Sequence, residues 1–436
     1  MAREFDFCIF GGTGLTGKQI VRHVFELSVT HPDFFASGFQ WAIAGRNAEK
    51  LEAVIDEFVR KYPEAVVAKP SVLVANVTSR DQIDAMTTKS KVLINAVGPF
   101  RFMGEYVVRS CVETGCNYVD VTGEPEFIER MQRTYQEKAK AKGVTIVHAC
   151  GFDSVPTDLG VLYTKQLYTQ RNWTINQIEM FLKIHVGPAG IRGGYATFES
   201  AVHGFGSAEL LKEIRKASTL KKLPKPQGQK LQFHSHVAYD NEFGYHVPFV
   251  FADPSVVRLS QQIFLSGLAQ PSSSDDVVTP PPTVQFAAYM LIPSLWYVML
   301  YFMYGIIFSF LAKAPWGRQL LLDHPALFSG GVFSKEHPTQ EQLDQCSFEV
   351  ILRSKGYDNA VELKHDAPPN QTMKVVVRGP ELGYVATPRI VVQCAMALLN
   401  HPNKVPHGVL TPSTAFWRTD IIEKLRFVGI TCDVSC

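Results

Sequence analysis

The sequence predicts an α/β fold: an N-terminal Rossmann domain with a doubly wound parallel sheet, followed by a C-terminal α+β domain with an apolar membrane-associating insert. Three observations predict it: strand–helix alternation in the first third of the chain, a glycine-rich turn directly after the first strand, and a long uncharged apolar run in the second half. The chain has 436 residues, which is too long for one ordinary domain. We expect the Rossmann domain to cover 1–168 and an α+β substrate domain to cover 169–385.

Short β-rich apolar runs alternate with helical patterns from the N-terminus onward. Because this alternation builds βαβ units, the strands should form one parallel sheet. Six strands match a complete doubly wound nucleotide-binding sheet. The expected strands are 5–11, 40–45, 72–77, 92–97, 118–121 and 145–150, and the expected helices are 15–29, 47–61, 80–88, 104–115, 125–142 and 156–168.

The alternation stops near residue 170, which predicts a second domain with a more antiparallel sheet. Three segments have the composition of loops: the glycine-rich 187–194, the Lys-, Pro- and Gln-rich 221–230, and the linker-like 270–282. The expected elements are strands 175–186, 231–237, 347–353 and 373–378, and helices 198–217, 388–399 and 421–428.

Charge and cysteine usage exclude several functional classes. The chain carries 43 basic and 41 acidic side chains, and this near balance argues against binding to nucleic acid. The 8 cysteines are scattered without a C-x-x-C pair or zinc-ligand spacing, so we expect no metal site and a reducing compartment. The N-terminus enters a strand at once and lacks the layout of a signal peptide.

The strongest local motif is a glycine-rich turn between the first strand and the first helix. Glycines at 11, 14 and 17 sit where the chain must turn sharply, and a missing Cβ lets backbone approach a pyrophosphate. The helix N-terminus that follows offers N–H donors and the positive end of its dipole. The predicted cofactor-binding residues of this turn are Gly11, Gly12, Thr13, Gly14, Leu15, Thr16 and Gly17.

Residues after the next strands complete the expected cofactor site. The second strand ends at Arg46, where NAD-preferring sites carry an acidic residue, so its guanidinium favours the 2′-phosphate of NADP, with NAD as the alternative. Asn76 follows the third strand and could approach the adenine. Asn95, Val97 and Gly98 end the fourth strand, at the edge of a parallel sheet where ligands bind.

Several motifs occur in one order along the chain: the turn at 10–17, Ala-Gly-Arg at 44–46, Asn-Ala-Val-Gly-Pro-Phe at 95–100, Tyr-Val-Asp-Val-Thr-Gly-Glu at 118–124, and Gly-Phe-Asp-Ser-Val-Pro-Thr-Asp at 151–158. Together they resemble the saccharopine dehydrogenase-like oxidoreductase family. The resemblance continues through His-Gly-Phe-Gly at 203–206, the apolar run and Gly-Pro-Glu-Leu-Gly-Tyr-Val-Ala-Thr-Pro at 379–388, so it covers nearly the whole chain.

The resemblance implies nicotinamide-dependent redox chemistry. It also implies that 386–436 form C-terminal helices which pack back on the Rossmann domain. The family includes lysine-pathway saccharopine reductases and bacterial enoyl reductases that act on lipid intermediates. Its animal branch is linked to lipid droplets and membranes, which implies a location on lipid droplets or on the cytoplasmic side of membranes.

Hydride transfer needs a proton donor or acceptor near the nicotinamide, and four acidic residues lie at or just beyond the ends of the fifth and sixth strands. Asp153 is the candidate catalytic residue. Each acidic residue also has a structural interpretation as a turn or helix-start residue. Arg101 and the loop 187–195, which contains Arg192 and Tyr195, could contact substrate or be solvated. The other three acidic residues are Asp120, Glu124 and Asp158.

Residues 277–312 contain no charged side chain, and the segment 284–312 is long enough to span a bilayer. Three interpretations are open: a single span, a monotopic hairpin or in-plane helix broken at Pro293 and near Gly305, and a helix buried in the second domain or in a subunit contact. The length of the uncharged run favours monotopic attachment to a membrane or lipid droplet.

These observations predict an NADP-dependent oxidoreductase of lipid metabolism, attached to a lipid surface through 284–312 and acting on a small, lipid-like substrate. Two alternatives stay open. One is a soluble saccharopine-type amino-acid dehydrogenase, which would need several arginines for the substrate carboxylates. The other is an inactive NADP-binding scaffold protein of lipid droplets. We expect no nucleic-acid partner, and a homodimer is left open.

Overall fold

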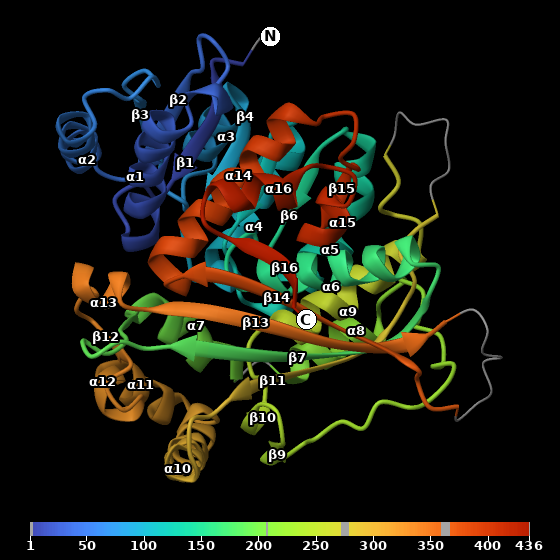
Figure 1. Cartoon of the computed structure of the whole chain (residues 1–436). Helices are drawn as coiled ribbons and strands as arrows, with labels where there is room; N and C mark the ends of the chain where they lie inside the picture. Colours follow the sequence, from blue (N-terminus) through green and yellow to red (C-terminus); the bar gives the residue numbers. More distant parts are fainter. Residues whose placement is uncertain (1–2, 206–207, 272–278, 359–366, 436) are drawn as a thin grey trace. The chain divides into compact units, whose positions relative to one another are not determined.

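The structure is a computed structural model that describes residues 3–205, 208–271, 279–358 and 367–435 (Figure 1). The chain forms two compact units, which are described separately. The first unit comprises Met1–Phe152, Leu268–Val277 and Gly383–Val428, and the second comprises Asp153–Gly267, Val278–Leu382 and Gly429–Cys436. These ranges interleave, whereas we expected consecutive domains that divide at residues 168 and 385.

The first unit is built on a seven-stranded sheet with the order β15-β6-β5-β4-β1-β2-β3. All of its strand pairs are parallel. The order from β3 to β6 is that of the Rossmann fold, which confirms the prediction. The strands are β1 (Phe5–Phe10), β2 (Trp41–Gly45), β3 (Ser71–Val74), β4 (Ser90–Asn95), β5 (Asn117–Asp120), β6 (Thr145–Val147) and β15 (Gly408–Leu410).

Helices that follow these strands begin within a few residues of the expected positions. They are α1 (Leu15–Thr30), η1 (Pro32–Phe34), α2 (Ala48–Lys61), α3 (Arg80–Lys89), α4 (Phe100–Thr114) and α5 (Pro125–Ala141). Later in the chain come η2 (Leu382–Ala386), α14 (Thr387–Asn400), α15 (Pro412–Phe416) and α16 (Ile421–Phe427). The almost entirely buried α14 packs against α1, β4 and β5, so a late segment covers the sheet of the first unit (Figure 1).

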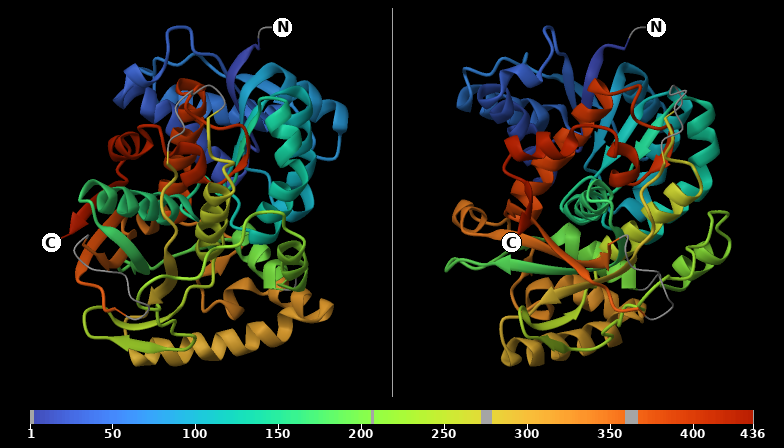
Figure 2. Two further views of the ribbon diagram at one scale, coloured as in Figure 1. Left: turned by 90° about the vertical axis from the view of Figure 1, so that its right-hand side faces the viewer. Right: turned by 45° about the vertical axis from the view of Figure 1, so that its right-hand side comes forward.

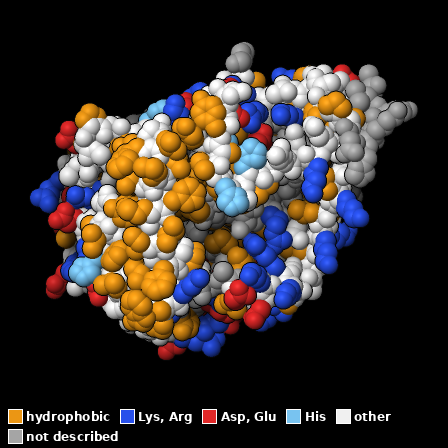
Figure 3. Space-filling model, turned by 90° about the horizontal axis from the view of Figure 1, so that it is seen from below, with side chains coloured by type: hydrophobic (Ala, Val, Ile, Leu, Met, Phe, Trp, Pro, Cys, Tyr) orange, Lys and Arg blue, Asp and Glu red, His pale blue; other side chains and the backbone are white. Residues whose placement is uncertain are grey.

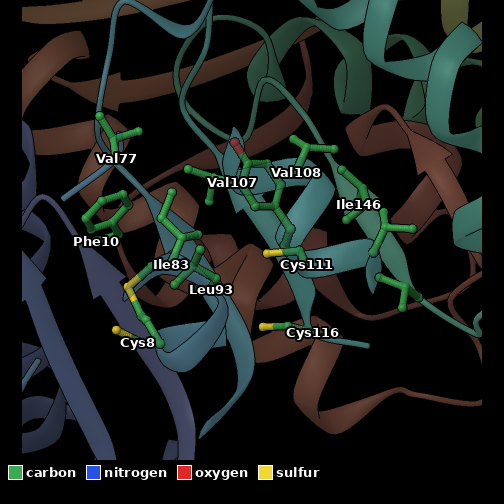
Figure 4. Close-up of a cluster of buried hydrophobic side chains, with 14 of the residues drawn as sticks. Cys8, Phe10, Val77, Ile83, Leu93, Val107, Val108, Cys111, Cys116 and Ile146 are labelled. Atoms are coloured by element: carbon green, nitrogen blue, oxygen red, sulfur yellow. The ribbon is translucent and has the colours of Figure 1, made fainter. Parts of the chain in front are cut away.

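Apolar side chains from the strands and from α4 form the core of the first unit (Figure 4). Phe10 and Leu93 lie among this cluster together with the thiols of Cys8, Cys111 and Cys116. Burial raises the pKa of the Cys8 thiol and of the Cys111 thiol, so both stay protonated. These cysteines therefore act as small apolar core residues.

A second seven-stranded sheet, with the order β16-β14-β13-β7-β11-β10-β9, organises the second unit. Only β7 and β11 pair in parallel, and the remaining pairs are antiparallel. The strands are β7 (Thr174–His185), β9 (Ala238–Asp240), β10 (Gly244–Pro248), β11 (Gln285–Leu291), β13 (Ser347–Tyr357), β14 (Gln371–Pro380) and β16 (Thr431–Ser435). The short strands β8 (Gly193–Gly194) and β12 (Phe333–Ser334) form a separate pair.

Two buried helices cover this sheet: α6 (Val155–Gln170) packs on β7, β13 and β14, and α9 (Asp253–Leu265) packs on α6 and β11. The remaining helices are α7 (Tyr195–Phe205), α8 (Ala208–Lys216), α10 (Leu295–Ala312), α11 (Pro315–Asp323), α12 (Pro325–Phe328) and α13 (Gln340–Asp344). In Figure 2, α10 is the long gold helix at the outer side of the second unit.

Two predictions for the second unit are wrong. Residues 231–237 form no strand, because side chains bind the backbone there: Leu231 N–H donates to Gln285 Oε1 and His234 N–H donates to the Tyr289 hydroxyl. The apolar segment 284–312 is not one insert, since β11 occupies its first part and pairs with both β7 and β10. The apolar helix begins at Leu295 and continues through Gly305 without a break.

Other differences are smaller. The expected helix 198–217 is two helices, α7 and α8, and residues 206–207 between them lie outside the described residues. The linker-like segment 270–282 also falls largely outside the described residues, which omit 272–278. Residues 221–230 lack helix and strand, as expected for a loop.

Candidate functional site

The candidate cofactor site lies at the carboxyl ends of β1 and β4, where the strand order of the parallel sheet reverses. This switch point is where open α/β sheets bind ligands. The turns that follow the two strands touch each other: Ala96 N–H donates to Phe10 O at 2.9 Å, and a Cβ added to Gly11 would lie 3.0 Å from Val97 Cγ2. The predicted residues after β1 and after β4 are therefore brought together.

The glycines of the first turn leave room that a side chain would fill. Gly11 has φ 95°, a left-handed conformation that favours glycine. A Cβ on Gly17 would lie only 2.0 Å from Gly11 O, and one on Gly14 would lie 3.3 Å from the same oxygen. Backbone is thus packed on backbone, which is the arrangement that a pyrophosphate-binding turn requires.

Helix α1 begins within this turn, at Leu15, with an uncapped N-terminus. Its N-cap residue is the extended Gly14, which has no side chain to bind the first N–H groups, and no acidic residue lies in the first turn. Those N–H groups and the positive end of the helix dipole suit an anion. Thr13 and Gly14 are exposed, whereas Gly12 is buried against Ile43 and Leu51.

Arg46 follows β2 and is exposed, and it forms no hydrogen bond or ion pair with any residue that the structure describes. Its neighbour Asn47 caps α2, where Asn47 Oδ1 accepts from Lys50 N–H at 2.9 Å. Asn76 Oδ1 accepts hydrogen bonds from the N–H and the hydroxyl of Thr78, at 3.2 and 3.1 Å. The side-chain nitrogen Nδ2 of Asn76 is the part that remains for a ligand.

Asn95 has a structural position that the sequence did not reveal. It is fully buried: its Oδ1 accepts from Val97 N–H at 3.0 Å, and its Nδ2 donates to the Tyr118 hydroxyl at 3.1 Å. Both ends of the amide therefore bind within the domain. Asn95 fixes the turn that carries Val97 and the exposed Gly98, rather than presenting its own side chain to a ligand.

Asp120, one of the acidic candidates, is the centre of a buried network. The Tyr118 hydroxyl donates to Asp120 Oδ2 at 2.9 Å, His148 Nδ1 lies 2.7 Å from the same oxygen, and Ala149 N–H donates to Asp120 Oδ1 at 3.0 Å. Burial, reinforced by the Asp120 carboxylate, raises the pKa of Tyr118. This network joins the carboxyl ends of β4, β5 and β6, and it supports the structural interpretation of Asp120.

Arg101 and Glu124 form a buried ion pair at the start of α4. Glu124 accepts from the N–H of Phe100 and of Arg101, at 3.0 and 3.1 Å, and from Arg101 Nε at 3.0 Å. Because the Arg101 side chain is only 6% exposed, it is neither a solvated charge nor a free site for an anionic substrate. Arg192 is also paired, through Nη1 at 2.7 Å from Glu336 Oε2.

Asp153 is brought together with Asp253, a residue that sequence reasoning missed. Burial raises the pKa of both carboxyl groups, and the Asp253 carboxylate, within hydrogen-bonding range, raises that of Asp153 further. A proton shared between the two carboxyl groups would relieve the repulsion between them. Thr157 Oγ1 donates to Asp253 Oδ2 at 2.6 Å and fixes the second carboxylate.

Asp158 lies one turn further along α6 and accepts from Ser260 Oγ at 2.8 Å. Its burial between α6 and α9 supports the structural interpretation of this residue. Lys165, in the same helix, is also buried, and burial lowers its pKa to about 7 although Asp158 opposes the shift. Asp158 and Lys165 thus belong to the polar contact between the two helices.

The raised pKa of Asp153 gives a stability prediction for Asp153→Asn. A raised pKa means that the folded state retains a proton which the unfolded chain releases above pH ~4, so wild-type stability falls as the pH rises from there towards the folded pKa. The neutral amide removes this dependence. We therefore expect the difference in free energy of unfolding, variant minus wild type, to increase by about 1 kcal/mol or more as the pH rises from 5 to 8. Urea unfolding followed by tryptophan fluorescence measures it, and parallel pH curves would contradict the shared proton.

Helix α10 presents an apolar surface on the second unit. Val298, Leu311 and Ala312 are buried, whereas nine large apolar side chains on its other faces are exposed. Figure 3, which shows the side of the molecule that carries α10, has an extended field of hydrophobic side chains. The exposed residues are Leu295, Trp296, Tyr297, Met299, Phe302, Met303, Ile306, Ile307 and Phe310.

By length and hydropathy, two helical segments among the described residues could cross a membrane, Leu295–Ala312 and Leu382–Asn400. The second is mostly buried and contains α14, so its apolar composition is that of a core helix of the first unit. The first is mostly exposed. The alternative of a helix buried within the second domain is therefore wrong for α10.

Comparisons with known proteins agree with this geometry. A family model for the saccharopine dehydrogenase NADP binding domain matches residues 7–147. A lipid droplet localized protein of Caenorhabditis elegans is 30% identical, with 98% of this chain and 97% of that protein covered. The apo saccharopine dehydrogenase (L-Glu forming) of Saccharomyces cerevisiae has a TM-score of 0.52 over 99% of both chains at 12% identity, which shows a shared fold.

The saccharopine dehydrogenase-like oxidoreductase of Pongo abelii is 38% identical over 436 residues, which cover 99% of this chain and 97% of that protein. Similarity of this extent leaves no large part of either chain unmatched. The turn after β1 and the turn after β4 both lie within the residues that the NADP-binding family model matches. The chain belongs to the saccharopine dehydrogenase-like oxidoreductases, and its first unit contains their NADP-binding domain.

Proposed function

We propose that this protein is an NADP-dependent oxidoreductase that works on a hydrophobic, lipid-like substrate while attached to a lipid surface. The observation that carries the redox part is the turn from Gly11 to Gly17, which leaves the start of α1 open at the switch point of the sheet. Residues proposed to hold the cofactor are Gly11, Gly12, Thr13, Gly14, Leu15, Thr16, Gly17, Arg46, Asn76, Val97 and Gly98, with Asn95 as the residue that positions the second turn.

Each part of this site has a defined task. The N–H groups at the start of α1 bind the pyrophosphate, and the free guanidinium of Arg46 binds the 2′-phosphate. When bound, NADPH supplies a hydride. Asp153 is our proposed proton donor, because burial raises the pKa of its carboxyl group and favours the protonated form.

The proposed attachment to a lipid surface rests on the environment of α10. A helix on the surface of a soluble protein carries polar residues on its outer face, but α10 is apolar all round and its outer face is exposed. Both ends of α10 pack on the same unit: Val298, near its start, is buried, and near its end Phe308 contacts Phe198 and Phe205 while Leu311 joins the cluster formed by α7 and α11. The helix therefore lies along the surface of the unit, as an in-plane anchor does.

Because α10 lies along the surface of the second unit, a single span is disfavoured. In a span, the two ends of the helix would emerge on opposite sides of a bilayer. Helix α10 has 18 residues and is about 27 Å long, so a span would use its whole length.

The relative named as a lipid droplet localized protein supports the droplet as the location. We place the protein on lipid droplets and on the cytoplasmic side of membranes, where a lipid-like substrate is at hand. The ion pairs of Arg101 and Arg192 disfavour the polycarboxylate substrate of an amino-acid dehydrogenase.

The redox part is tested by calorimetric titration of the detergent-solubilised protein with NADPH and then with NADH. Micromolar or tighter binding of NADPH supports the proposal, and reduction of unsaturated or carbonyl-containing lipids is then followed by NADPH absorbance. Failure of both dinucleotides to bind a folded sample would overturn it. Binding without turnover of any lipid class would favour the inactive scaffold.

Arg46→Glu should reverse the cofactor preference. The substitution replaces the proposed partner of the 2′-phosphate with a carboxylate that repels it and that can accept the ribose hydroxyls of NAD. We expect the Kd for NADPH to rise at least about 30-fold, equivalent to some 2 kcal/mol, while the Kd for NADH changes little or falls. Arg60→Glu, an exposed charge reversal late in α2, is the control. Equal losses for both dinucleotides in Arg46→Glu would remove the case for NADP preference.

A further inference from the structure

The segment 215–230 carries a concentration of positive charge that the proposed chemistry does not use. It begins in the last turn of α8 and continues through the loop 221–230. No acidic residue occurs between Glu213 and Asp240, whereas the whole chain has a net charge of only +2. Its basic residues are Arg215, Lys216, Lys221, Lys222, Lys225 and Lys230.

The five lysines of this basic segment are exposed, and none of them forms an ion pair with a residue that the structure describes. Their charges are therefore available to a partner. The backbone that carries them is nevertheless attached to the second unit at both ends. Lys221 N–H donates to Ser266 Oγ at 2.9 Å, Gln262 Nε2 donates to Lys221 O at 3.2 Å, and Gln229 N–H donates to the Tyr357 hydroxyl at 2.9 Å.

The basic segment lies on the side of the second unit that carries α10. Figures 1 and 2 show the yellow-green chain after α8 running along that side. Figure 3, seen from the same side, shows Lys and Arg side chains gathered beside the hydrophobic field. A surface that meets this face of the second unit therefore meets both hydrophobic and positively charged side chains.

We propose that the basic segment binds the anionic phospholipid headgroups of the same lipid surface in which α10 is seated. This proposal rests on the proposed function, because it takes the lipid attachment of α10 as given. An apolar helix beside unpaired lysines is the pattern by which interfacial proteins combine burial with electrostatic attraction. Lysines near an anionic surface each contribute about fivefold to binding, and the attraction decreases within a Debye length.

A membrane explains the pairing of features better than an acidic protein or nucleic acid would. Those partners would use the lysines but would leave the exposed apolar face of α10 in water. Lys313 and Trp316, which are exposed just after the end of α10, are residue types found at the level of the headgroups. Anionic lipid would therefore meet positive charge along the border of the apolar helix.

The test compares flotation of the full chain on triolein droplets coated with phosphatidylcholine alone or with about one-fifth phosphatidylserine added. The variant is Lys221→Gln with Lys222→Gln and Lys225→Gln. We expect it to lose about a hundredfold in partition onto the phosphatidylserine-containing droplets and to bind the phosphatidylcholine droplets as wild type does. Added salt should weaken wild-type binding to the anionic droplets only.

The matched control changes three exposed lysines of the first unit, Lys138→Gln with Lys140→Gln and Lys142→Gln, and should behave as wild type. Equal binding of wild type and the 221–225 variant to anionic droplets would overturn the inference while leaving the role of α10 intact. Absence of wild-type binding to both kinds of droplet would instead overturn the proposed lipid attachment itself. Retention of the anionic preference by an α10 variant that no longer binds phosphatidylcholine would support the inference independently.

Discussion

Gly17→Ala is expected to abolish NADPH binding. The added Cβ would lie 2.0 Å from Gly11 O and 3.2 Å from Gly12 Cα, and both contacts are with backbone that cannot rotate away. Relief requires the first turn of α1 to move off the loop, which separates the N–H groups that are proposed to bind the pyrophosphate. We expect the Kd for NADPH to rise at least about 100-fold, equivalent to some 2.7 kcal/mol, by calorimetric titration.

The control for this variant is Gly305→Ala, which places a Cβ in open space and should leave cofactor binding unchanged. If Gly17→Ala also unfolds the first unit, Gly14→Ala offers a milder test, because its Cβ would lie 3.3 Å from Gly11 O and needs only a small adjustment. It should weaken binding while circular dichroism stays that of wild type. Unchanged NADPH affinity in both glycine variants would mean that the pyrophosphate lies elsewhere.

The first unit could be predicted from the sequence because its signals are local. Each strand is a short apolar run, each helix follows it directly, and the turn from Gly11 to Gly17 carries its own steric reason for glycine. The parallel order then follows from βαβ connections. Strand β15 was not predicted, because its three residues pair with β6, which lies about 260 residues earlier in the chain.

The second unit was harder to predict because its decisive contacts are distant in sequence. Strand β11 and helix α10 are both apolar, so one uncharged run concealed a buried strand next to an exposed helix. Asp253 lies 100 residues from Asp153 in a helix start, where an acidic residue has an ordinary structural explanation. Only the packing of α9 on α6 brings the two carboxyl groups together.

Burial also changes the roles expected for polar residues at the edge of the parallel sheet. Asn95 and Arg101 stand at the edge of the parallel sheet where ligands bind, and their residue types suit a ligand. Their partners, Tyr118 and Glu124, come from neighbouring strand ends and bind them first. The sequence shows that a polar side chain lies at the edge of the sheet. It does not show which neighbouring residue already forms hydrogen bonds with that side chain.

Ile306→Glu combined with Phe310→Glu should release the protein from lipid droplets without destabilising it in water. Ile306 and Phe310 are 69% and 68% exposed on the outer face of α10, so in water the carboxylates would replace apolar surface at no cost in packing. In lipid, each charge costs about 2.5 kcal/mol or more at the depth of the hydrocarbon, so droplet partition should fall by a factor on the order of a thousand.

Flotation on phosphatidylcholine-coated triolein droplets measures this release, and thermal unfolding in detergent-free buffer measures stability. The matched control, Val59→Glu with Val66→Glu, places two carboxylates at exposed apolar positions of the first unit and should still float. If the α10 variant stayed on the droplets, the helix would not be the anchor. If it instead lost stability in water, the outer face of α10 would be covered by protein, as in a subunit contact. Release together with unchanged stability and unchanged NADPH affinity is the outcome that only a lipid-seated helix, separate from the cofactor site, would give.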